Sequence, residues 1–330
     1  MSFKTDQESL RKWFLETKRE FPWRNQITPY KVWISEVMLQ QTRADVVVDY
    51  FERWMQLFPT IQDLKNAPLE SVLKAWEGLG YYSRARNIHK AAESLASHFP
   101  KDYSSLISIK GIGAYTADAI LSFAFHEKVI AMDANVERVL SRYFALHDLK
   151  EIKKRAEGDL SPLHPFEIAE ALIELGATIC KKKPECENCP LSKGCLAYKN
   201  GSIPQYPLAK KRKQTQEVFI EVQIYQYKEL FGVNKKGKNE LFQDLYLFHE
   251  NRVSEEIFLE ITAKSLFKKV VATATFYRFH LIANLIEIDH PIEGLEFLSL
   301  NECLKKSFSS GHKRILHQLV SIKENQECIP

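Results

Sequence analysis

The sequence predicts a mainly α-helical N-terminal domain followed by a smaller α+β domain. Over residues 1–200, segments of roughly 10–15 residues with helical spacing of apolar side chains alternate with breaks that contain Pro or Gly. From residue 215 to 330, aromatic and β-branched residues alternate with polar ones, which is the period of a strand. Residues 201–214 between them contain glycine, two prolines and a basic run without periodicity, so we expect a linker there.

The bulk composition is that of an ordinary globular protein. The 330 residues suffice for about two domains, and 45% of them are hydrophobic and 27% charged. The charged start, M-S-F-K-T-D-Q-E, is not typical of a signal peptide, and the apolar run 119–125 is too short to cross a bilayer, so we expect an intracellular protein with no membrane partner. Residues 1–213 carry 32 Lys and Arg against 26 Asp and Glu, which favours this part for binding a polyanion.

The first helix with a chemical signal is T-P-Y-K-V-W-I-S-E-V-M-L-Q-Q-T at 28–42. Thr28 followed by Pro29 is typical of a helix start, because threonine caps the free N–H groups and proline fits the first helical position. Glu36 lies among apolar residues on this helix. It is either a solvated glutamate at the edge of the apolar face or an acid whose pKa is raised by an apolar pocket.

The segment L-I-S-I-K-G-I-G-A-Y-T-A-D-A-I-L-S-F at 106–123 predicts two helices joined by a Gly-x-Gly turn, a helix–hairpin–helix. Gly111 and Gly113 permit positive φ and a close backbone approach, and the N–H groups at the start of the second helix can hold a phosphate. The hairpin indicates sequence-independent contact with a DNA backbone.

A second carboxylate follows in M-D-A-N-V-E-R-V-L, where Asp133 comes after an apolar stretch and Asn135 two residues later. One interpretation is a plain helix N-cap. The other is an ionised carboxylate, held so by backbone donors, opposite a protonated partner. A protonated Glu36 with an ionised Asp133 is the pair that breaks glycosidic bonds, and with a phosphate-binding hairpin it suggests an N-glycosidic bond in DNA. The base must leave the stack, so Gln41, Tyr81 and Tyr82 are candidate wedges.

Four of the six cysteines lie within sixteen residues, at Cys180, Cys186, Cys189 and Cys195. Their gaps are five, two and five residues, and close cysteines in an intracellular protein are typical of metal ligands. Four thiolates can hold zinc or a four-iron cluster. Zinc ribbons usually show two C-x-x-C pairs, and only one is present, so the spacing favours an iron–sulfur cluster.

In the second domain we expect strands at 217–227, 241–248 and 274–288 and a helix at 312–320. Ile220, Val222 and Ile224 alternate along the first of these strands and should share a buried face.

These motifs together resemble adenine DNA glycosylases of the MutY family, within the helix–hairpin–helix, endonuclease III-like superfamily. The resemblance covers residues 22–195 and rests on P-W-R (22–24), 28–42, G-L-G-Y-Y-S-R-A-R-N (78–87), G-I-G-A-Y-T-A (111–117), D-A-N-V-E-R-V-L (133–140) and the cysteines. It implies a six-helix hairpin part at about 23–125, a [4Fe-4S] cluster module at about 1–22 and 126–200, and a MutT-like (Nudix-fold) domain at 215–330 that recognises the mismatch.

The resemblance also implies roles for individual residues. Glu36 would be the general acid at adenine N7, Asp133 would stabilise the oxocarbenium-like sugar, and Tyr115 and Asn135 would order these carboxylates. The adenine pocket would be formed by Trp23, Arg24, Leu39 and Glu170. Gln41 and Tyr81 would enter the duplex, Gly111 and Gly113 would bind the backbone, and the four clustered cysteines would hold the iron.

Three departures from the family pattern stand out. The first cysteine gap is five residues instead of six, and Ala134 stands where glycine is common. In the C-terminal domain, Phe276, Tyr277 and Arg278 replace a Phe-Ser-His loop that reads 8-oxoguanine, and no Nudix catalytic box is present. This change predicts weakened or altered recognition of 8-oxoguanine.

The resemblance thus predicts a base-excision-repair enzyme that hydrolyses the N-glycosidic bond of adenine mispaired with 8-oxoguanine or guanine in double-stranded DNA. It would leave an abasic site without cutting the strand, because Tyr115 replaces the lysine of the lyases and cannot form a Schiff base. We expect a monomer in the bacterial cytoplasm, associated with the nucleoid. The alternatives are an endonuclease III-like glycosylase/lyase and a catalytically inactive DNA-binding protein.

Overall fold

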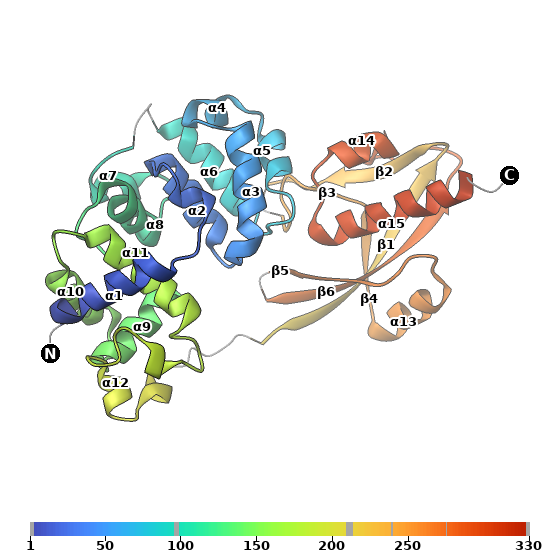
Figure 1. Ribbon diagram of the computed structural model, residues 1–330. Coiled ribbons are helices and arrows are strands. Elements are labelled where there is room, and N and C mark those ends of the chain that lie inside the picture. The colour runs from blue at the N-terminus through green and yellow to red at the C-terminus, as the bar shows by residue number, and fades with distance from the viewer. Residues whose placement is uncertain (1–2, 96–98, 209–213, 239, 275, 328–330) are drawn as a thin grey trace. The chain divides into compact units, whose positions relative to one another are not determined.

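The computed structural model describes residues 3–95, 99–208, 214–238, 240–274 and 276–327 (Figure 1). Contacts divide the chain into two compact units. Unit 1 is Met1–Asn66 with Asn87–Lys211, and unit 2 is Ala67–Arg86 with Arg212–Pro330. The basic run of the predicted linker, 210–213, lies outside the described residues. The boundaries expected from the sequence at residues 200 and 214 stay a prediction.

Unit 1 is helical throughout its described part, which confirms the prediction of a mainly α N-terminal domain. Its helices are α1 (Phe3–Thr17), α2 (Pro29–Leu39), α3 (Ala44–Leu57), α4 (Ile61–Asn66), α7 (Tyr103–Ser108), α8 (Ala114–Ala119), α9 (Ala134–Phe144), α10 (Leu149–Asp159), α11 (Pro165–Thr178) and α12 (Leu196–Lys199). Helix α6 (Ser83–Ser94) begins in unit 2 and ends in unit 1. Short 3-10 turns occupy η1 (Pro22–Arg24), η3 (Cys186–Asn188) and η4 (Ile203–Gln205), and α8 continues into a π-helical turn, η2 (Ile120–Ala124).

Helix α2 begins where the sequence predicts. The Thr28 hydroxyl accepts a hydrogen bond of 3.2 Å from the backbone N–H of Lys31, and Pro29 occupies the first helical position. Since both features satisfy or remove N–H groups that would otherwise lack partners, they fix this helix end. The helix is buried on nearly every side, from Tyr30 to Met38, so its only acid is carried into the core.

The helix–hairpin–helix is present, formed by α7, the turn at 109–113 and α8. Gly111 has φ of +104°, and a Cβ added there would lie 2.9 Å from the Cβ of Asn87, so this position requires glycine. Gly113 differs from the expectation. It is the extended N-cap of α8 with φ of −87°, and a Cβ there would meet nothing within 4 Å.

The cysteine-bearing half of unit 1 is built on α1, α9, α10 and α11, whose apolar faces share one core. Gly176 on α11 makes the closest approach within it. A Cβ at Gly176 would lie 2.5 Å from the Cβ of Asn135 on α9. The two helices can therefore approach each other at this point only because the side chain is a hydrogen.

Unit 2 contains a mixed sheet in the order β3-β2-β1-β6-β5, with β4 paired to β1 and β7 paired to β2 (Figure 1). The strands are β1 (Gln216–Tyr227), β2 (Leu230–Lys235), β3 (Tyr246–Leu247), β4 (His249–Val253), β5 (Val270–Ala274), β6 (Tyr277–Glu287) and β7 (Glu296–Ser299). The long central pair, β1 and β6, is parallel, and the other pairs are antiparallel. This mixed sheet confirms the predicted α+β class.

The strand at 217–227 and its alternation are confirmed, since Ile220, Val222 and Ile224 are buried together in the core of unit 2. The strand predicted at 241–248 is wrong for most of its length. Phe242 and Asp244 have φ of +66° and +61°, which is a turn conformation, and only Tyr246–Leu247 is strand. The segment 274–288 is divided between the end of β5 and β6.

In the described part of unit 2, the helices that lie wholly within the unit are α5 (Leu69–Ala75), α13 (Glu255–Lys264), α14 (Leu300–Lys305) and α15 (Ser310–Glu327). Helix α14 begins with a capping box in which Ser299 and Glu302 satisfy each other's backbone N–H groups. Helix α15 is the predicted C-terminal helix, and it extends beyond the expected 312–320 at both ends.

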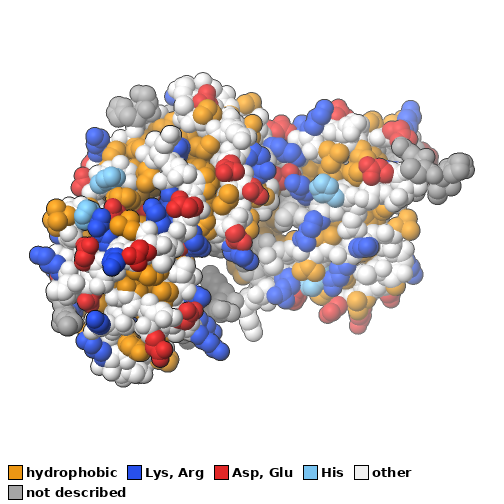
Figure 2. All heavy atoms as spheres, viewed as in Figure 1, with side chains coloured by type: hydrophobic (Ala, Val, Ile, Leu, Met, Phe, Trp, Pro, Cys, Tyr) orange, Lys and Arg blue, Asp and Glu red, His pale blue; other side chains and the backbone are white. Residues whose placement is uncertain are grey.

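On the face shown in Figure 2, basic and acidic side chains are interspersed rather than separated. Among the described residues no helix combines the length and the apolar character that a bilayer crossing requires.

Candidate active site

The predicted catalytic and adenine-pocket residues meet in one cavity of unit 1, with a volume of about 950 Å³. Its wall is contributed by α2, α8, α9, α11 and the η1 turn. The lining includes these predicted residues: Trp23, Arg24, Glu36, Leu39, Gln41, Tyr115, Asp133, Asn135 and Glu170. Tyr81, Gly111, Gly113 and the segment 276–278 do not line it.

Glu36 is buried in this wall, with 8% of its surface exposed. Burial is the main cause that raises its pKa from 4.5 to about 7, and the charges of Asp133 and Glu170 act in the same direction. A hydrogen bond from Tyr115 and the charge of Arg24 oppose the rise. The solvated alternative is therefore excluded by the geometry, and the side chain holds a proton over much of the neutral range.

Tyr115 on α8 supplies that hydrogen bond. Its hydroxyl donates to Oε2 of Glu36 at 2.5 Å. Burial, followed by the charges of Glu36 and Asp133, raises the pKa of Tyr115 well above its usual range, so the phenol stays protonated as a donor. With Oε2 occupied as an acceptor, Oε1 of Glu36 is the atom able to carry the acid proton.

Asp133 caps α9, as the sequence allowed. Its Oδ1 accepts from the backbone N–H of Val136 at 2.7 Å, and its Oδ2 accepts from the amide of Asn135 at 2.9 Å. Burial is the largest influence and raises the pKa of Asp133, whereas these donors and the charge of Arg138 oppose the rise. The sequence predicted that backbone donors alone would keep Asp133 ionised, whereas in the structure burial outweighs these donors and raises its pKa.

Ala134, where the family commonly has glycine, is the first residue of α9 and is exposed. Its Cβ therefore meets no crowding within the protein. The departure at this position leaves the cap of Asp133 intact.

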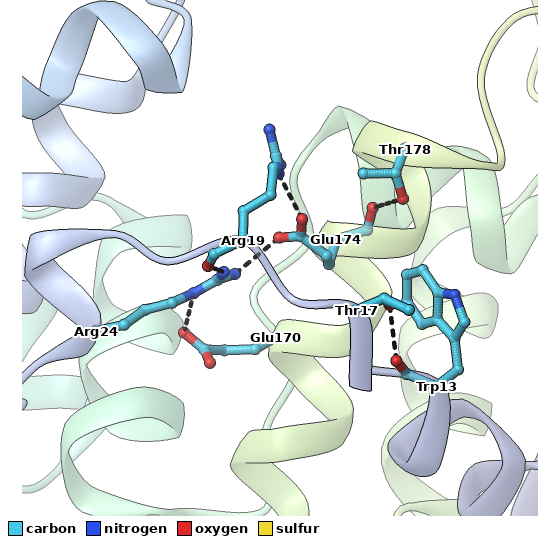
Figure 3. Close-up of polar contacts among 7 residues, drawn as sticks. All are labelled: Trp13, Thr17, Arg19, Arg24, Glu170, Glu174 and Thr178. Carbon is cyan, nitrogen blue, oxygen red and sulfur yellow. Dashed lines mark hydrogen bonds and ion pairs between the residues drawn. The ribbon is translucent and has the colours of Figure 1, made fainter. Parts of the chain in front are cut away.

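Arg24 is held by an ion-pair network that the sequence did not reveal (Figure 3). Its Nη2 donates to Oε2 of Glu174 at 2.9 Å and its Nε lies 3.4 Å from Oε1 of Glu170. Arg19 donates to the other oxygen of Glu174 at 2.5 Å. Figure 3 shows Arg24 lying between the two carboxylates of α11, with Arg19 next to it, and Nη1 of Arg24 donates to the carbonyl of Arg19 at 2.5 Å.

The network sets different protonation tendencies for its two acids. Burial raises the pKa of Glu170 despite the neighbouring charge of Arg24. Burial also acts to raise the pKa of Glu174, but its hydrogen bonds with Arg19 and Arg24 outweigh this and lower it. Glu174 is thus a permanent carboxylate, only 1% exposed, that fixes Arg24 at the cavity. In the sequence, the i, i+4 spacing of Glu170 and Glu174 indicates that both lie on one face of a helix. It does not reveal Arg24 as their partner, because Arg24 is 150 residues away from Glu174.

The other pocket residues divide into a buried ring and exposed turn positions. Trp23 is 8% exposed and stacks on Phe21 at 4.6 Å between ring centroids, while Leu39 is half-buried at the end of α2.

The candidate wedges lie outside this buried part. Gln41 follows α2 with φ of +59° and is exposed. Tyr81 in unit 2 also has a positive φ, +48°, and is 42% exposed. Both candidate wedges are therefore presented by tight turns. The third candidate, Tyr82, is 8% exposed, and its burial contradicts a wedge role.

The four clustered cysteines line one small cavity in unit 1, together with Arg142. Burial, followed by the charges of the other three cysteines, raises the pKa of Cys189 to about 12. Thiolates in this cavity therefore require a positively charged partner, and the donor set fits the four-cysteine ligation of an iron–sulfur cluster. Among the described residues, no group of three His, Cys, Asp or Glu has the geometry to hold a single metal ion.

A chain of hydrogen bonds connects this module with the cavity of Glu36. Arg138 donates to the carbonyl of Cys180 at 2.6 Å and to Oδ1 of Asn135 at 2.8 Å, and Asn135 in turn bonds Asp133. Arg138 also donates to the carbonyl of Gly176 at 2.7 Å. The guanidinium of Arg138 thus bonds the backbone of Cys180 and the side chain of Asn135, and Asn135 in turn holds the carboxylate of Asp133.

The predicted lesion loop lies at the start of β6 in unit 2. Phe276 is 38% exposed, and its ring is 4.5 Å from that of Tyr277. Arg278 pairs with Oε1 of Glu217 at 2.9 Å, and His280 contacts the other oxygen at 2.6 Å. The guanidinium is therefore already engaged on the sheet.

Comparison with known proteins defines the class. The family described as HhH-GPD superfamily base excision DNA repair protein matches residues 34–162, which hold the hairpin and both candidate carboxylates. The chain is similar to the solved structure of a thermostable thymine-DNA glycosylase, with a TM-score of 0.56 and 26% identity over 60% of this chain and 96% of that chain. It is also similar to endonuclease III in a non-covalent DNA complex, with a TM-score of 0.53 and 26% identity over 61% of this chain and 99% of that chain. The fold and the site are those of a helix–hairpin–helix DNA-repair protein with an endonuclease III-like helical domain.

The relatives narrow this class further. Adenine DNA glycosylase of Buchnera aphidicola subsp. Baizongia pistaciae is 33% identical over 94% of this chain and 89% of its own length. The protein of the same name from Buchnera aphidicola subsp. Acyrthosiphon pisum is 31% identical over 92% of this chain and 88% of its own length, and the one from Homo sapiens is 39% identical over 57% of this chain and 38% of its own length. The chain belongs to the adenine DNA glycosylase family, and the resemblance inferred from its motifs is confirmed.

Proposed function

We propose that this protein excises adenine mispaired with 8-oxoguanine or guanine from double-stranded DNA, by hydrolysing the N-glycosidic bond and leaving an abasic site. The proposed setting is a monomer in the bacterial cytoplasm that acts on nucleoid DNA. The observation that carries the proposal is the buried Glu36, whose pKa is raised to about 7 and whose Oε2 is held by Tyr115.

Glu36 is the proposed general acid. An acid with a pKa near the operating pH is protonated in a useful fraction of molecules and still transfers its proton readily. Protonation at N7 lets the base accept the electron pair of the breaking C–N bond and depart as neutral adenine. Tyr115 and the cavity wall hold the carboxyl in place, and this saves the cost of orienting it at the moment of reaction.

Asp133 is the proposed partner on the sugar. Loss of the base leaves positive charge on the ring, which a fixed carboxylate stabilises electrostatically or captures as a covalent intermediate. The bonds from Val136 and Asn135 keep the carboxylate oriented without needing to move. Water then completes the hydrolysis in either form of the mechanism.

The adenine itself would occupy the cavity beside Trp23, Arg24, Leu39 and Glu170. Its volume of about 950 Å³ is sufficient for one extruded nucleotide and water. The fixed guanidinium of Arg24 and the carboxyl of Glu170, whose pKa is raised, supply polar atoms for the edge of the base. Trp23 and Leu39 supply the apolar faces.

Recognition of the duplex is proposed for elements outside the cavity. The hairpin at Gly111 and Gly113 would contact the phosphate backbone, and Gln41 and Tyr81 would fill the space that the extruded base leaves. Phe276, Tyr277 and Arg278 would read the base opposite adenine. Because Arg278 is paired with Glu217, we propose that reading of 8-oxoguanine depends mainly on Phe276 and Tyr277.

The enzyme is proposed to be monofunctional. A lyase reaction requires an amine that attacks the sugar carbon, and no described residue that lines the cavity is a lysine. Tyr115 stands at the hairpin position where the lyases carry that lysine, and its hydroxyl is engaged by Glu36.

We further propose that Cys180, Cys186, Cys189 and Cys195 hold a [4Fe-4S] cluster. Bound there, the cluster would cross-link the loop after α11 to the start of α12 and fix the position of Arg138 through the Cys180 carbonyl. Although the first gap is one residue shorter than is usual in the family, Cys180 and Cys186 line the same cavity as the other two cysteines.

The test is single-turnover release of adenine from A:8-oxoguanine, A:G and A:C duplexes by the parent protein and by Glu36→Gln. We expect release by the parent from the first two duplexes and none by Glu36→Gln, which retains shape and DNA affinity but lacks the acid. Excision by Glu36→Gln at the parent rate would exclude the proposed acid.

A second candidate, an endonuclease III-like glycosylase/lyase, is favoured only by the similarity of the helical domain to endonuclease III. Sodium borohydride distinguishes the two functions, because it traps a Schiff base as a stable enzyme–DNA adduct. We expect no adduct with an adenine-containing mispair.

A further inference from the structure

The turn that presents Tyr81 is bound to the C-terminal part of unit 2 through the buried carboxylate of Glu77. The side chain of Glu77 is 5% exposed. Its Oε2 accepts from Nζ of Lys313 at 2.6 Å, and its Oε1 accepts from the backbone N–H of Phe308 at 3.2 Å. One carboxylate thus bonds both a side chain of α15 and the backbone just before that helix.

Neighbouring contacts follow the same path. Lys74, which also pairs with Glu77 at 2.9 Å, donates to the carbonyls of Leu304 and Lys306, both at 2.9 Å. The hydroxyl of Tyr82 donates to the carbonyl of Phe308 at 3.3 Å. The segment 304–313 therefore holds residues on both sides of the turn.

The turn itself is rigidly built. Gly78, Gly80 and Tyr81 have φ of +109°, +71° and +48°. The carbonyl of Gly80 accepts from Nε1 of Trp76 at 3.0 Å and from Nη2 of Arg84 at 3.2 Å. The Arg84 guanidinium also lies 5.3 Å from the ring of Trp76 and 5.5 Å from that of Tyr81. The position of Tyr81 thus depends on Trp76, the residue directly before Glu77.

We propose that Glu77 and Lys313 are positioning residues that let the C-terminal domain set the place and stiffness of Tyr81. This inference rests on the proposed function, in which Tyr81 enters the duplex. Its new content is that the pair of Glu77 and Lys313 takes part in base extrusion, in addition to any reading of the opposite base by the loop at 276–278. A misplaced wedge slows extrusion, because the energy of unstacking is no longer recovered by an inserted ring.

The test is a double-mutant cycle between Lys313→Gln and Tyr81→Ala, measured as single-turnover adenine release. Each single variant should be slower than the parent by about tenfold, as expected for a small displacement of a group that acts on the substrate. If Lys313 acts through Tyr81, the double variant should be no slower than Tyr81→Ala alone. Lys313→Arg should restore the rate, because it retains the charge that bonds Glu77.

The matched control is Lys305→Gln, which removes the same charge from an exposed residue eight positions earlier in the same unit. It should release adenine at the parent rate. The inference would be overturned if the rate reduction in the double variant were the product of the reductions in Lys313→Gln and Tyr81→Ala. It would also be overturned if Lys313→Gln released adenine at the parent rate. Both results concern the inference alone, since the parent would still excise adenine.

A second readout does not depend on excision. Amide hydrogen exchange of residues 76–84 in the free protein should be faster in Lys313→Gln than in Lys305→Gln, because the turn loses an anchor. Equal exchange in the two variants would overturn the inference even if the parent excised no adenine. Faster exchange in Lys313→Gln, together with an inactive parent, would overturn only the proposed function and the step at the duplex that rests on it.

Discussion

Tyr115 donates a hydrogen bond of 2.5 Å to Oε2 of Glu36, joining two helices whose residues are 79 positions apart in the sequence. The bond has two effects on the carboxyl group. It lowers the pKa of Glu36 against the stronger effect of burial, and it directs the acid proton to the other oxygen. The pKa of Glu36 is therefore set by two opposed influences, burial and the hydrogen bond from Tyr115, and a substitution can change one without the other.

The first prediction concerns pH. The pKa of Glu36 is raised to about 7, and the protonated form is the one that transfers a proton. The single-turnover rate of adenine release should therefore stay high below this pH and fall by about tenfold per unit above it. A series of rates between pH 5 and pH 9 measures the curve. A rate that rises through this interval would contradict a general acid at Glu36.

The second prediction concerns Tyr115→Phe, which removes the hydroxyl but keeps the ring. Since the hydrogen bond lowers the pKa of Glu36, its loss should raise that pKa further and move the alkaline fall in rate to higher pH. The maximal rate should also fall, because the carboxyl is no longer oriented. Tyr103→Phe is the control, as Tyr103 is 40% exposed and does not line the cavity. An unchanged alkaline limb in Tyr115→Phe would contradict the proposed balance.

The third prediction concerns Glu174, the carboxylate that fixes Arg24. Glu174→Gln leaves Arg24 with a weaker partner at a buried position, so unfolding free energy should fall by about 3 kcal/mol. Adenine release by the folded variant should also be slower than by the parent, because Arg24 lines the cavity and loses the carboxylate that fixes it. Thermal unfolding and single-turnover rates at saturating enzyme measure the two effects.

Glu167→Gln is the control for Glu174. Glu167 lies on the same helix and pairs with Arg11, but it does not line the cavity. It should keep the parent rate. Equal rates of adenine release by Glu174→Gln and Glu167→Gln would mean that Arg24 does not contribute to binding the adenine.

Local signals in the sequence were sufficient where neighbours along the chain decide the structure. Thr28 and Pro29 fixed the start of α2, and the alternation of Ile220, Val222 and Ile224 fixed the buried face of β1. The strand predicted at 241–248 failed because its aromatic composition is that of a strand, whereas Phe242 and Asp244 adopt left-handed turn conformations.

The site was predictable to the extent that its residues carry chemistry of their own. An acid among apolar residues pointed to Glu36, and burial with a raised pKa supports that reading. The partners that hold the site could not be found in this way. Arg19 and Glu174 meet across 155 positions, and both are residue types that ordinarily face solvent.

The fourth prediction concerns Gly176, where α11 meets α9. A methyl group there would lie 2.5 Å from the Cβ of Asn135 and 2.9 Å from its backbone oxygen, so Gly176→Ala must displace the residue that orients Asp133. We expect a loss of about 1–3 kcal/mol in unfolding free energy and a fall in excision rate of tenfold or more. Chemical denaturation and single-turnover kinetics measure these quantities.

Gly158→Ala provides the comparison for Gly176, because a Cβ at Gly158 in α10 would meet nothing within 4 Å. This variant should be as active as the parent and more stable by about 0.5–1 kcal/mol, as expected for alanine in a helix. If Gly176→Ala behaved like Gly158→Ala, Asn135 would not be the residue that positions Asp133.

The fifth prediction concerns the reading of 8-oxoguanine by Phe276. The ring is 38% exposed and contacts Tyr277, so Phe276→Ala should alter stability little but remove a surface on which a base can stack. Since stacking of a base on an aromatic side chain contributes about 1–3 kcal/mol, the ratio of excision rates for A:8-oxoguanine and A:G should fall by about tenfold.

Leu266→Ala, at a residue that is 78% exposed in the same unit, should leave the ratio unchanged. Arg278→Ala should also change the ratio less than Phe276→Ala, because its guanidinium is already paired with Glu217. An equal loss on both duplexes in Phe276→Ala would mean that this ring contacts DNA without distinguishing the oxidised base.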